Sequence, residues 1–598
     1  MGDDLTMITR NVASGGSFLF DSTEADSIFI PEDITKEQQM MVTMLNDFIE
    51  NEVLPHDEEI ENRNYELHLE LLRKTGELGI LGADIPEEFG GLGLDKVTGN
   101  FISEAYSKGT SFAITLGTQM GIGSLPIVYF GTQEQKQRYL PSMATGEKVG
   151  AYCLTEPSSG SDALSVKTTA VLSEDGNHYI INGSKIFITN AAIADIFIVF
   201  AKVDGKHFSA FIVEKDSPGF TVGPEEKKMG IVGSSTCSLF FENVMVPTEN
   251  LLGEIGKGHL IAFNILNIGR HKLPVSCLGN AKVALGLTSK YANERIQFGT
   301  PIAKFPVIGK KVAESNIVLY VLESMLYRLA GQYDKILKTD DLSDSDSASK
   351  TAAAISEYNI ESSICKVFGS EALDFVVDEG VQIHGGYGYT KEYKIERLYR
   401  DSRINRIFEG TNEINRNIIS STIIKKATKN QLPLLDKILT VEEELRRFVP
   451  EKTFEGTLEK ELYLESNAKK IYFLIIGNAM KKFEGNLDKQ QVLLASLADI
   501  VIQIFAINSA ILRTKKLISR NGELKTKNAI QMTQVFVQES FEKIQKLAKE
   551  SASIIAEEGE LVKLLSNLRN LSEYIPSNTA ILKQEIADKI AITEKYNV

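Results

Sequence analysis

The spacing of apolar residues changes twice along the chain and divides it into helical and β segments. From residue 35 to about residue 140, apolar positions recur with helical spacing. Thr35 and Thr132 are each followed three residues later by Gln, which is typical of a capping box at a helix start. Between about 150 and 250 the period becomes two, as in strands, and helical spacing returns from about 258 to 425 and again beyond 430. The pattern predicts a mainly α protein with a central β domain.

Short polar sequences predict where these elements are interrupted. Asp175-Gly176 and Asn182-Gly183 have the composition of hairpin turns, and the second is expected to join strands at 179–181 and 185–188. The Asp- and Ser-rich stretch 340–346 predicts a solvated loop inside the second helical region.

Length and composition indicate a large soluble protein. A chain of 598 residues is too long for one compact core and suggests three or four domains. Hydrophobic residues make up 43% and charged residues 24%, which is ordinary for a globular protein. The first residues are acidic and lack the apolar core of a secretory signal, and we find no apolar run of membrane-spanning length. We therefore expect a cytoplasmic, bacterial-type protein without a transmembrane segment.

Charge and cysteine content exclude some classes of partner. A net charge of −15 and a pI near 5.2 argue against nucleic acid, so any anionic ligand must meet a local cluster of Arg and Lys. The four cysteines are scattered without a C-x-x-C pair, which predicts reduced thiols and no metal site.

Glu409 is the strongest candidate for a reactive group. It lies between Phe408 and Gly410, and the glycine lets another molecule approach the backbone closely. A carboxylate flanked by apolar groups is the kind whose pKa rises towards neutrality, where it can act as a base. Thr411 is expected to be the N-cap of a following helix, with Glu413 in its first turn. The alternative is a helix-end carboxylate that pairs with the arginines at 397, 400, 403 and 406.

Two further segments decide between these interpretations. One is Ala-Tyr-Cys-Leu-Thr-Glu-Pro-Ser-Ser-Gly-Ser-Asp at 151–162, and the other is Gln-Ile-His-Gly-Gly-Tyr-Gly-Tyr at 382–389. Together with the Glu-Gly-Thr turn, they resemble the two signature regions of the acyl-CoA dehydrogenase family. The resemblance covers about 40–425 and is closest to the very-long-chain branch, in 226–230, in 266–270 and in a long C-terminal extension.

The resemblance implies an acyl-CoA dehydrogenase fold. It comprises an N-terminal helical domain, a β-barrel-like middle domain, a C-terminal four-helix bundle and an additional helical domain. The predicted bounds are 35–149 for the N-terminal helical domain, 150–257 for the middle β domain, 258–428 for the C-terminal bundle and 429–598 for the additional helical domain, preceded by an N-terminal segment at 1–34.

The implied activity is FAD-dependent α,β-dehydrogenation of long-chain fatty acyl-CoA to trans-2-enoyl-CoA, the first step of fatty acid β-oxidation. Electrons would pass to electron-transfer flavoprotein. Glu409 matches the base that removes the α-proton, and the family holds the thioester oxygen with that residue's backbone N–H and a ribityl hydroxyl of FAD. Some members place the base just before a matching arginine, a position that is Gly269 here and cannot act as a base. An acyl-CoA oxidase and a non-catalytic, family-derived assembly protein are the alternatives.

The residues that match the family's FAD contacts are spread over several segments. Phe187 stands where many relatives have tryptophan, and this chain has none. Arg295 matches an arginine that binds the FAD diphosphate of a neighbouring subunit, so we expect a homodimer or a dimer of dimers. The full predicted set is Tyr152, Leu154, Thr155, Ser161, Phe187, Thr189, Arg295, Phe298, Gln382, Gly385, Gly386, Thr411 and Glu413.

The residues expected to contact substrate are Ser161, Asn267, Arg270, Phe408 and Gly410. Small residues at 119–124, including Gly123, would leave volume for a long acyl chain, or would serve only helix–helix packing. Pro126 departs from the glycine expected in the very-long-chain branch. That branch carries a membrane-associating segment in its extension. The matching apolar run at 469–476 is short enough to be a core helix, which we favour over weak membrane association.

Overall fold

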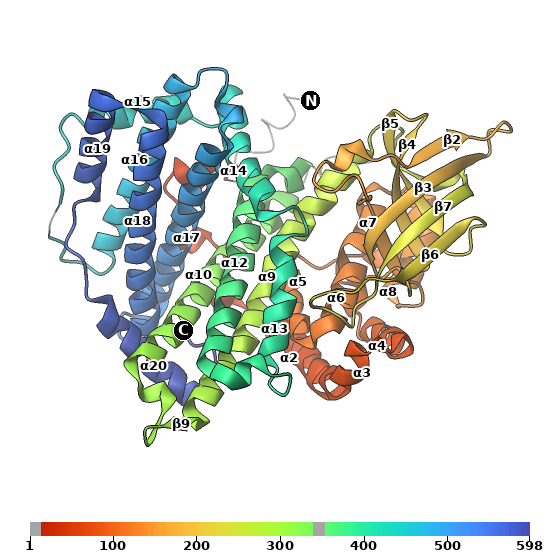
Figure 1. The fold of residues 1–598 in the computed structure, drawn as a ribbon, viewed down its shortest axis with the longest axis horizontal. Coiled ribbons are helices and arrows are strands. Elements are labelled where there is room, and N and C mark those ends of the chain that lie inside the picture. Colours follow the sequence, from red (N-terminus) through yellow and green to blue (C-terminus); the bar gives the residue numbers. More distant parts are fainter. Residues whose placement is uncertain (1–12, 339–352, 452) are drawn as a thin grey trace. The chain divides into compact units, whose positions relative to one another are not determined.

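The chain folds into two compact units. The computed structural model describes residues 13–338, 353–451 and 453–598 (Figure 1). The first unit, the β unit, contains Ile34–Lys272 and Ile336–Ser356. The second, the helical unit, contains Met1–Asp33, Leu273–Lys335 and Glu357–Val598. The predicted loop at 340–346 lies outside the described residues.

The β unit begins with a layer of helices whose starts match the sequence prediction. Thr35 and Thr132 each form a complete capping box with the Gln three residues later, as predicted. A π-helical turn at Gln119–Gly123 breaks the helical run and precedes a short helix. The helices are α2 (Lys36–Phe48), α3 (Asp57–Glu61), α4 (Tyr65–Glu77), α5 (Lys96–Tyr106), α6 (Thr110–Thr118), α7 (Leu125–Phe130) and α8 (Gln133–Ala144).

The strands of the β unit form one eight-stranded sheet in the order β6-β7-β3-β2-β4-β5-β8, with β1 pairing parallel to β4. Apolar side chains of this sheet and of the preceding helices form a common core, which includes Ile102, Phe112, Phe197 and Phe211. The strands are β1 (Gly150–Cys153), β2 (Thr169–Leu172), β3 (His178–Thr189), β4 (Ile196–Val203), β5 (His207–Glu214), β6 (Phe220–Glu225), β7 (Thr236–Pro247) and β8 (Leu251–Leu252).

One predicted turn is confirmed and the other is wrong. Asp175 and Gly176 lie between β2 and β3, which pair antiparallel. Asn182 and Gly183 instead lie inside β3, where the pairing with β7 shifts register between Ile181 and Gly183. The Asn182 side chain accepts a hydrogen bond of 2.8 Å from the backbone N–H of Asn243, so the polar pair marks a β-bulge rather than a chain reversal.

Long helices build the helical unit, and α9 contributes residues to both units. A short hairpin that the periodicity did not predict, β9 (Ile296–Gln297) with β10 (Thr300–Pro301), follows α9. The helices are α9 (Gly258–Glu294), α10 (Pro306–Leu337), α12 (Asn359–His384), α13 (Ile395–Ser402), α14 (Asn412–Thr428), α15 (Leu434–Glu444), α16 (Glu459–Lys482), α17 (Gln491–Asn521), α18 (Lys527–Ile555), α19 (Glu558–Ser572) and α20 (Thr579–Thr593).

The extension, residues 429–598, is a helical bundle in which α16, α17 and α18 pack against one another (Figure 1). The apolar run at 469–476 lies in α16, and its residues from Ile471 to Ile476 are all buried, as expected of a core helix. Two described segments, Lys96–Phe130 and Gln491–Asn521, are long and apolar enough to span a membrane by length and composition alone, which corrects the expectation that no apolar run reaches that length. Their most apolar windows are 83% and 78% buried inside the protein, so this is weak evidence for a membrane span.

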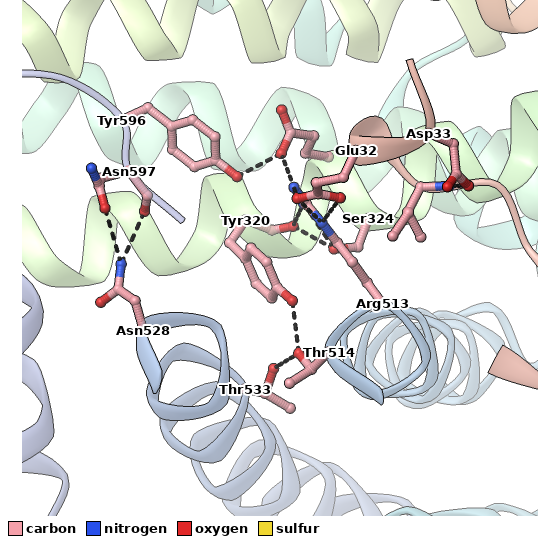
Figure 2. Close-up of polar contacts among 12 residues, drawn as sticks. Glu32, Asp33, Tyr320, Ser324, Arg513, Thr514, Asn528, Thr533, Tyr596 and Asn597 are labelled. Carbon is pink, nitrogen blue, oxygen red and sulfur yellow. Dashed lines mark hydrogen bonds and ion pairs between the residues drawn. The ribbon is translucent and has the colours of Figure 1, made fainter. Parts of the chain in front are cut away.

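A buried ionic network ties the extension to the rest of the helical unit (Figure 2). The Arg513 side chain, 1% exposed, lies 2.6 Å from Glu32 and 2.7 Å from Glu323. Tyr596 donates a hydrogen bond of 2.6 Å to Glu323, which also pairs with Lys282. Burial alone would raise the pKa of Glu323, but Lys282 and Arg513 lower it to about 2. One arginine thus joins α17 to α10 and to residue 32.

Replacing Arg513 should destabilise the helical unit. We expect Arg513→Met to lower the free energy of unfolding by about 3 kcal/mol or more, because it removes a cationic partner of the buried Glu323 carboxylate and breaks the pair with Glu32. Guanidinium unfolding followed by circular dichroism measures the loss. Thr533→Val is the control, because it removes an uncharged hydroxyl with its bond of 2.7 Å to Thr514 and should cost only about 1 kcal/mol. Equal losses in the two variants would contradict the importance assigned to Arg513.

Candidate functional site

Glu409 lies on a turn that an ordinary helix cannot provide. Its φ is 56°, and Gly410 follows with a φ of 81°, so two successive residues adopt the left-handed conformation. This conformation is uncommon and unfavourable for a residue with a Cβ. The turn half-buries Glu409 and ends at Thr411, whose side chain accepts a hydrogen bond of 3.3 Å from the N–H of Ile414. The predicted N-cap of α14 is therefore confirmed, and Glu413 is exposed in its first turn.

The arginines that precede Glu409 lie on α13 and on a 3-10 turn at Arg403–Arg406. Arg400 pairs with Glu396 at 2.8 Å, and Arg406 pairs with Asp374 at 2.9 Å. At least two of these cations therefore have an acidic partner other than Glu409.

Buried polar side chains that the sequence analysis did not single out contact the carbonyl groups of this turn. Lys366 on α12 donates to Gly410 O at 2.7 Å, and Asn415 on α14 donates to the same oxygen at 2.9 Å. Neither side chain has measurable exposure. The only sequence signal was Lys366 itself, a cation among apolar residues of a helix.

Arg295 and the 382–389 segment meet in the helical unit. The Arg295 guanidinium lies 5.5 Å from the ring centroid of Tyr387. Gly385 and Gly386 are exposed, and a Cβ added to either would meet open space, so a ligand could reach their backbone. Gln382 is also exposed. Phe298 is 95% exposed at the tip of the β9–β10 hairpin.

In the β unit, the segment after β1 is held by a buried ion pair that the sequence analysis did not assign. Lys185 on β3 lies 2.8 Å from the carboxylate of Glu156, and their side chains are 0% and 4% exposed. Lys185 also donates to Leu154 O at 3.2 Å. Burial favours the neutral acid, but Lys185 and hydrogen bonds from residues 167 and 168 leave the pKa of Glu156 below its usual value. The pair fixes the backbone on both sides of Thr155.

The predicted flavin contacts of this segment differ in exposure. The side chains of Tyr152 and Leu154 are buried, and the Tyr152 ring packs edge-on against Phe200 at 5.1 Å. These two residues therefore offer a ligand mainly their backbone. Thr155 is half-buried and Ser161 is exposed, so both hydroxyl groups can reach a ligand.

Phe187 is turned outward by a β-bulge. Between Lys185 and Ile188, β3 has one residue more than its partner β7, and the φ of Phe187 is 57°. The side chain is 60% exposed, which is unusual for phenylalanine in a sheet. Thr189, two residues further along β3, is half-buried. An exposed aromatic on strained backbone is a common feature of ligand sites.

The predicted substrate residues on α9 contact each other. Arg270 donates to Asn267 Oδ1 at 2.8 Å, and both residues are 5% exposed. Phe408 and Gly410 are half-buried beside Glu409 in the helical unit.

The expectation that Gly123 borders open volume is wrong. A Cβ at this position would lie 2.9 Å from Gly150 O and 3.0 Å from Thr118 O. Gln119 also bonds to the backbone there, accepting from Gly150 N–H at 2.7 Å. Gly123 therefore permits close packing of the π-helical turn against β1, whereas a Cβ added to Gly121 would meet open space. Pro126 is buried in α7.

Comparisons with known proteins identify the family. Sequence models of the acyl-CoA dehydrogenase N-terminal domain, middle domain and C-terminal domain match residues 35–147, 151–244 and 256–424, and a further acyl-CoA dehydrogenase C-terminal domain matches 467–570. A probable acyl-CoA dehydrogenase of Bacillus subtilis is 51% identical over 588 residues, which cover 98% of this chain and 99% of that protein. The rat mitochondrial very long-chain specific acyl-CoA dehydrogenase is 37% identical, covering 75% of this chain and 70% of the relative.

A solved structure agrees with these matches over nearly the whole chain. The crystal structure of acyl-CoA dehydrogenase complexed with FAD from Bacillus anthracis is 52% identical, with a TM-score of 0.96, and the match covers 98% of this chain and all of that one. The residues present here suit FAD: Gly385 and Gly386 leave backbone N–H groups open for phosphate oxygens, Arg295 supplies a cation, and Phe187 an exposed aromatic face. The chain thus belongs to the acyl-CoA dehydrogenase family, and it is an FAD-dependent oxidoreductase that acts on a CH–CH bond.

Proposed function

We propose that this protein dehydrogenates long-chain fatty acyl-CoA between the α and β carbons, with Glu409 as the base. The observation that carries the proposal is the left-handed turn that half-buries Glu409 at the start of α14. Such strain is tolerated where it aims a functional group. The neighbouring Gly410 leaves the backbone beside the carboxylate accessible to a thioester.

The reaction needs a proton acceptor and a hydride acceptor at the same time. The Glu409 carboxylate takes the α-proton, and the electron pair of that C–H bond becomes the new C=C bond as the β-hydrogen leaves with its own pair. When bound, FAD supplies the hydride acceptor. The α-proton is a weak acid, so the thioester oxygen must be hydrogen-bonded where enolate charge develops. The backbone N–H of Glu409 would supply one such donor, fixed in direction by the turn.

FAD contacts are proposed for residues of each unit taken separately. In the helical unit, Arg295 would pair with the diphosphate and the backbone at Gly385 and Gly386 would donate to it. In the β unit, the hydroxyl groups of Thr155, Ser161 and Thr189 would bond to the flavin and pyrophosphate. Three further predicted positions, Gln382, Thr411 and Glu413, are exposed or half-buried and would add contacts.

The preference for long chains rests on the very-long-chain relatives, because Gly123 no longer supports it. Arg270 and Asn267 would contact the CoA portion as a hydrogen-bonded pair. We further propose that electrons pass to electron-transfer flavoprotein. The protein would form a homodimer or a dimer of dimers and would be cytoplasmic.

A single experiment separates this proposal from an acyl-CoA oxidase and from a non-catalytic assembly protein. Palmitoyl-CoA is added to the flavin-loaded protein without oxygen, and the flavin absorbance is followed before oxygen is admitted. The proposal predicts bleaching followed by slow reoxidation. Rapid reoxidation with peroxide would identify an oxidase, and no bleaching would favour an assembly protein. Repeating the bleaching with acyl-CoA chains of about 4 to about 20 carbons gives the chain-length preference.

We expect Glu409→Gln to retain the fold and the flavin but to lose activity. The amide keeps the shape of the side chain and removes the proton acceptor, which costs roughly 10² to 10⁴ in rate. Stopped-flow flavin reduction with palmitoyl-CoA measures the effect, and the visible spectrum checks the flavin content. Reduction at the wild-type rate would show that the base lies elsewhere.

We expect the Phe187 ring to increase the affinity for FAD. We expect its positive φ to lower the stability of the apoprotein. Phe187→Ala and Phe187→Gly both remove the ring, and we expect each to raise the dissociation constant of FAD about tenfold, as loss of an aromatic stacking contact would. The glycine variant should be more stable than the alanine variant by about 1 kcal/mol, because glycine has no penalty at positive φ. Flavin fluorescence and urea unfolding of the apoprotein measure the two quantities. Wild-type FAD affinity in both variants would exclude contact between the ring and the flavin.

A further inference from the structure

The backbone conformation of the Glu409 turn needs outside support. Two successive residues with positive φ are not a stable local arrangement when one of them is glutamate, and the cost is on the order of 1–2 kcal/mol. Such a conformation persists only when surrounding contacts determine it. The contacts around this turn lie within the helical unit and are hydrogen bonds from buried side chains.

Lys366 is at the centre of that support. Its Nζ donates to Gly410 O at 2.7 Å and to Asn412 Oδ1 at 2.8 Å. Asn415 donates to Gly410 O at 2.9 Å and to Thr411 O at 3.0 Å. Lys366, Asn412 and Asn415 are all at most 3% exposed. The Gly410 carbonyl therefore has two buried donors, one charged, and its peptide plane is fixed next to Glu409.

The support continues outward along a chain of polar contacts. Asn412 Nδ2 donates to Glu371 Oε1 at 3.1 Å, and Arg416 Nη2 donates to the same oxygen at 2.8 Å. Arg416 Nε in turn donates to Asp499 Oδ1 at 2.8 Å. Burial disfavours the cation, yet Glu371 and Asp499 raise the pKa of Arg416 above its usual value.

Asp499 belongs to α17, a helix of the extension. A second contact lies nearby, where Ser420 on α14 donates to Leu494 O on α17 at 2.7 Å. The helix that begins directly after the Glu409 turn is thus anchored to the extension at two points.

We propose that Lys366 is a positioning residue for Glu409, and that Arg416 and Asp499 extend this support to α17 of the extension. Lys366 acts through the Gly410 carbonyl and not on substrate. The extension then serves the reaction by holding the base in place. This inference rests on the proposed role of Glu409.

The test compares three variants in the flavin-loaded full chain. Lys366→Met removes the charged donor from the turn, and Asp499→Asn removes the outer anion while keeping its shape. Glu357→Gln is the matched control, because it breaks an ion pair of 2.7 Å with Lys426 near the other end of α14. The Lys426 pair is about as buried as the Arg416–Asp499 pair, with side chains 13% exposed against 16% and 22%.

Hydrogen exchange of peptides spanning 405–416 provides a readout that does not depend on activity. We expect faster exchange in Lys366→Met and Asp499→Asn, and wild-type exchange in Glu357→Gln. Anaerobic flavin reduction by palmitoyl-CoA should slow by about tenfold or more in Lys366→Met, as misplacement of a catalytic group does, with less loss in Asp499→Asn. The dissociation constant of the acyl-CoA should stay at the wild-type value in each, since Lys366 and Asp499 do not contact it.

The outcomes distinguish the inference from the proposed function. If Lys366→Met does not fold, the Asp499→Asn variant decides. Slower flavin reduction and faster exchange at 405–416 than in Glu357→Gln would support the inference. The same reduction rate and exchange as in Glu357→Gln would overturn it. Wild-type exchange and reduction in a folded Lys366→Met protein also overturn it. Glu409→Gln is measured alongside. Flavin reduction at the wild-type rate in Glu409→Gln would reject the proposed function. If Glu409→Gln loses flavin reduction but the Lys366 and Asp499 variants keep wild-type reduction and exchange, only the positioning role is rejected.

Discussion

The constraint on which the candidate site depends is the left-handed backbone at Glu409 and Gly410. A glutamate inside a regular helix would continue along the helix surface, with its N–H committed to the helical hydrogen-bond ladder. The turn instead interrupts the chain between the 3-10 turn at Arg403–Arg406 and α14. Because the conformation is locally unfavourable, it requires donors such as Lys366 that are fixed by the packing of α12 and α14.

The β unit uses the same strategy with a different element. A sheet would normally alternate its side chains between two faces, but the bulge before Ile188 sends Phe187 outward at positive φ. The buried Glu156–Lys185 pair fixes the adjacent segment around Thr155. In both units, an irregular stretch of backbone presents the functional group. Lys366 bonds directly to the turn in the helical unit, whereas Lys185 bonds to the segment around Thr155 in the β unit. Neither cation would be expected to touch the ligand through its own side chain.

Local sequence signals predicted the local features well. The capping boxes at Thr35 and Thr132, the N-cap at Thr411 and the change to a period of two all depend on residues close together in the chain. The hairpin turn predicted at Asn182 and Gly183 was wrong because the same residue types favour a turn and a bulge. Only the partner Asn243 on β7 decides between the two. The open volume predicted at Gly123 was wrong because the sequence cannot distinguish a glycine that borders a cavity from one that permits close packing. The neighbouring Gly150 backbone decides between the two. Lys366 was missed because its partners lie more than forty residues away.

The most direct test is a crystal structure of the flavin-loaded protein with a long-chain 3-thiaacyl-CoA, in which sulfur replaces the β-carbon and no hydride can leave. We expect a Glu409 carboxylate oxygen about 3–3.5 Å from the α-carbon, the distance of a productive reacting pair. We also expect Glu409 and Gly410 to keep positive φ, with Lys366 still bonded to the Gly410 carbonyl. A different side chain facing the α-carbon, or Glu409 turned away from it, would contradict the role proposed for Glu409.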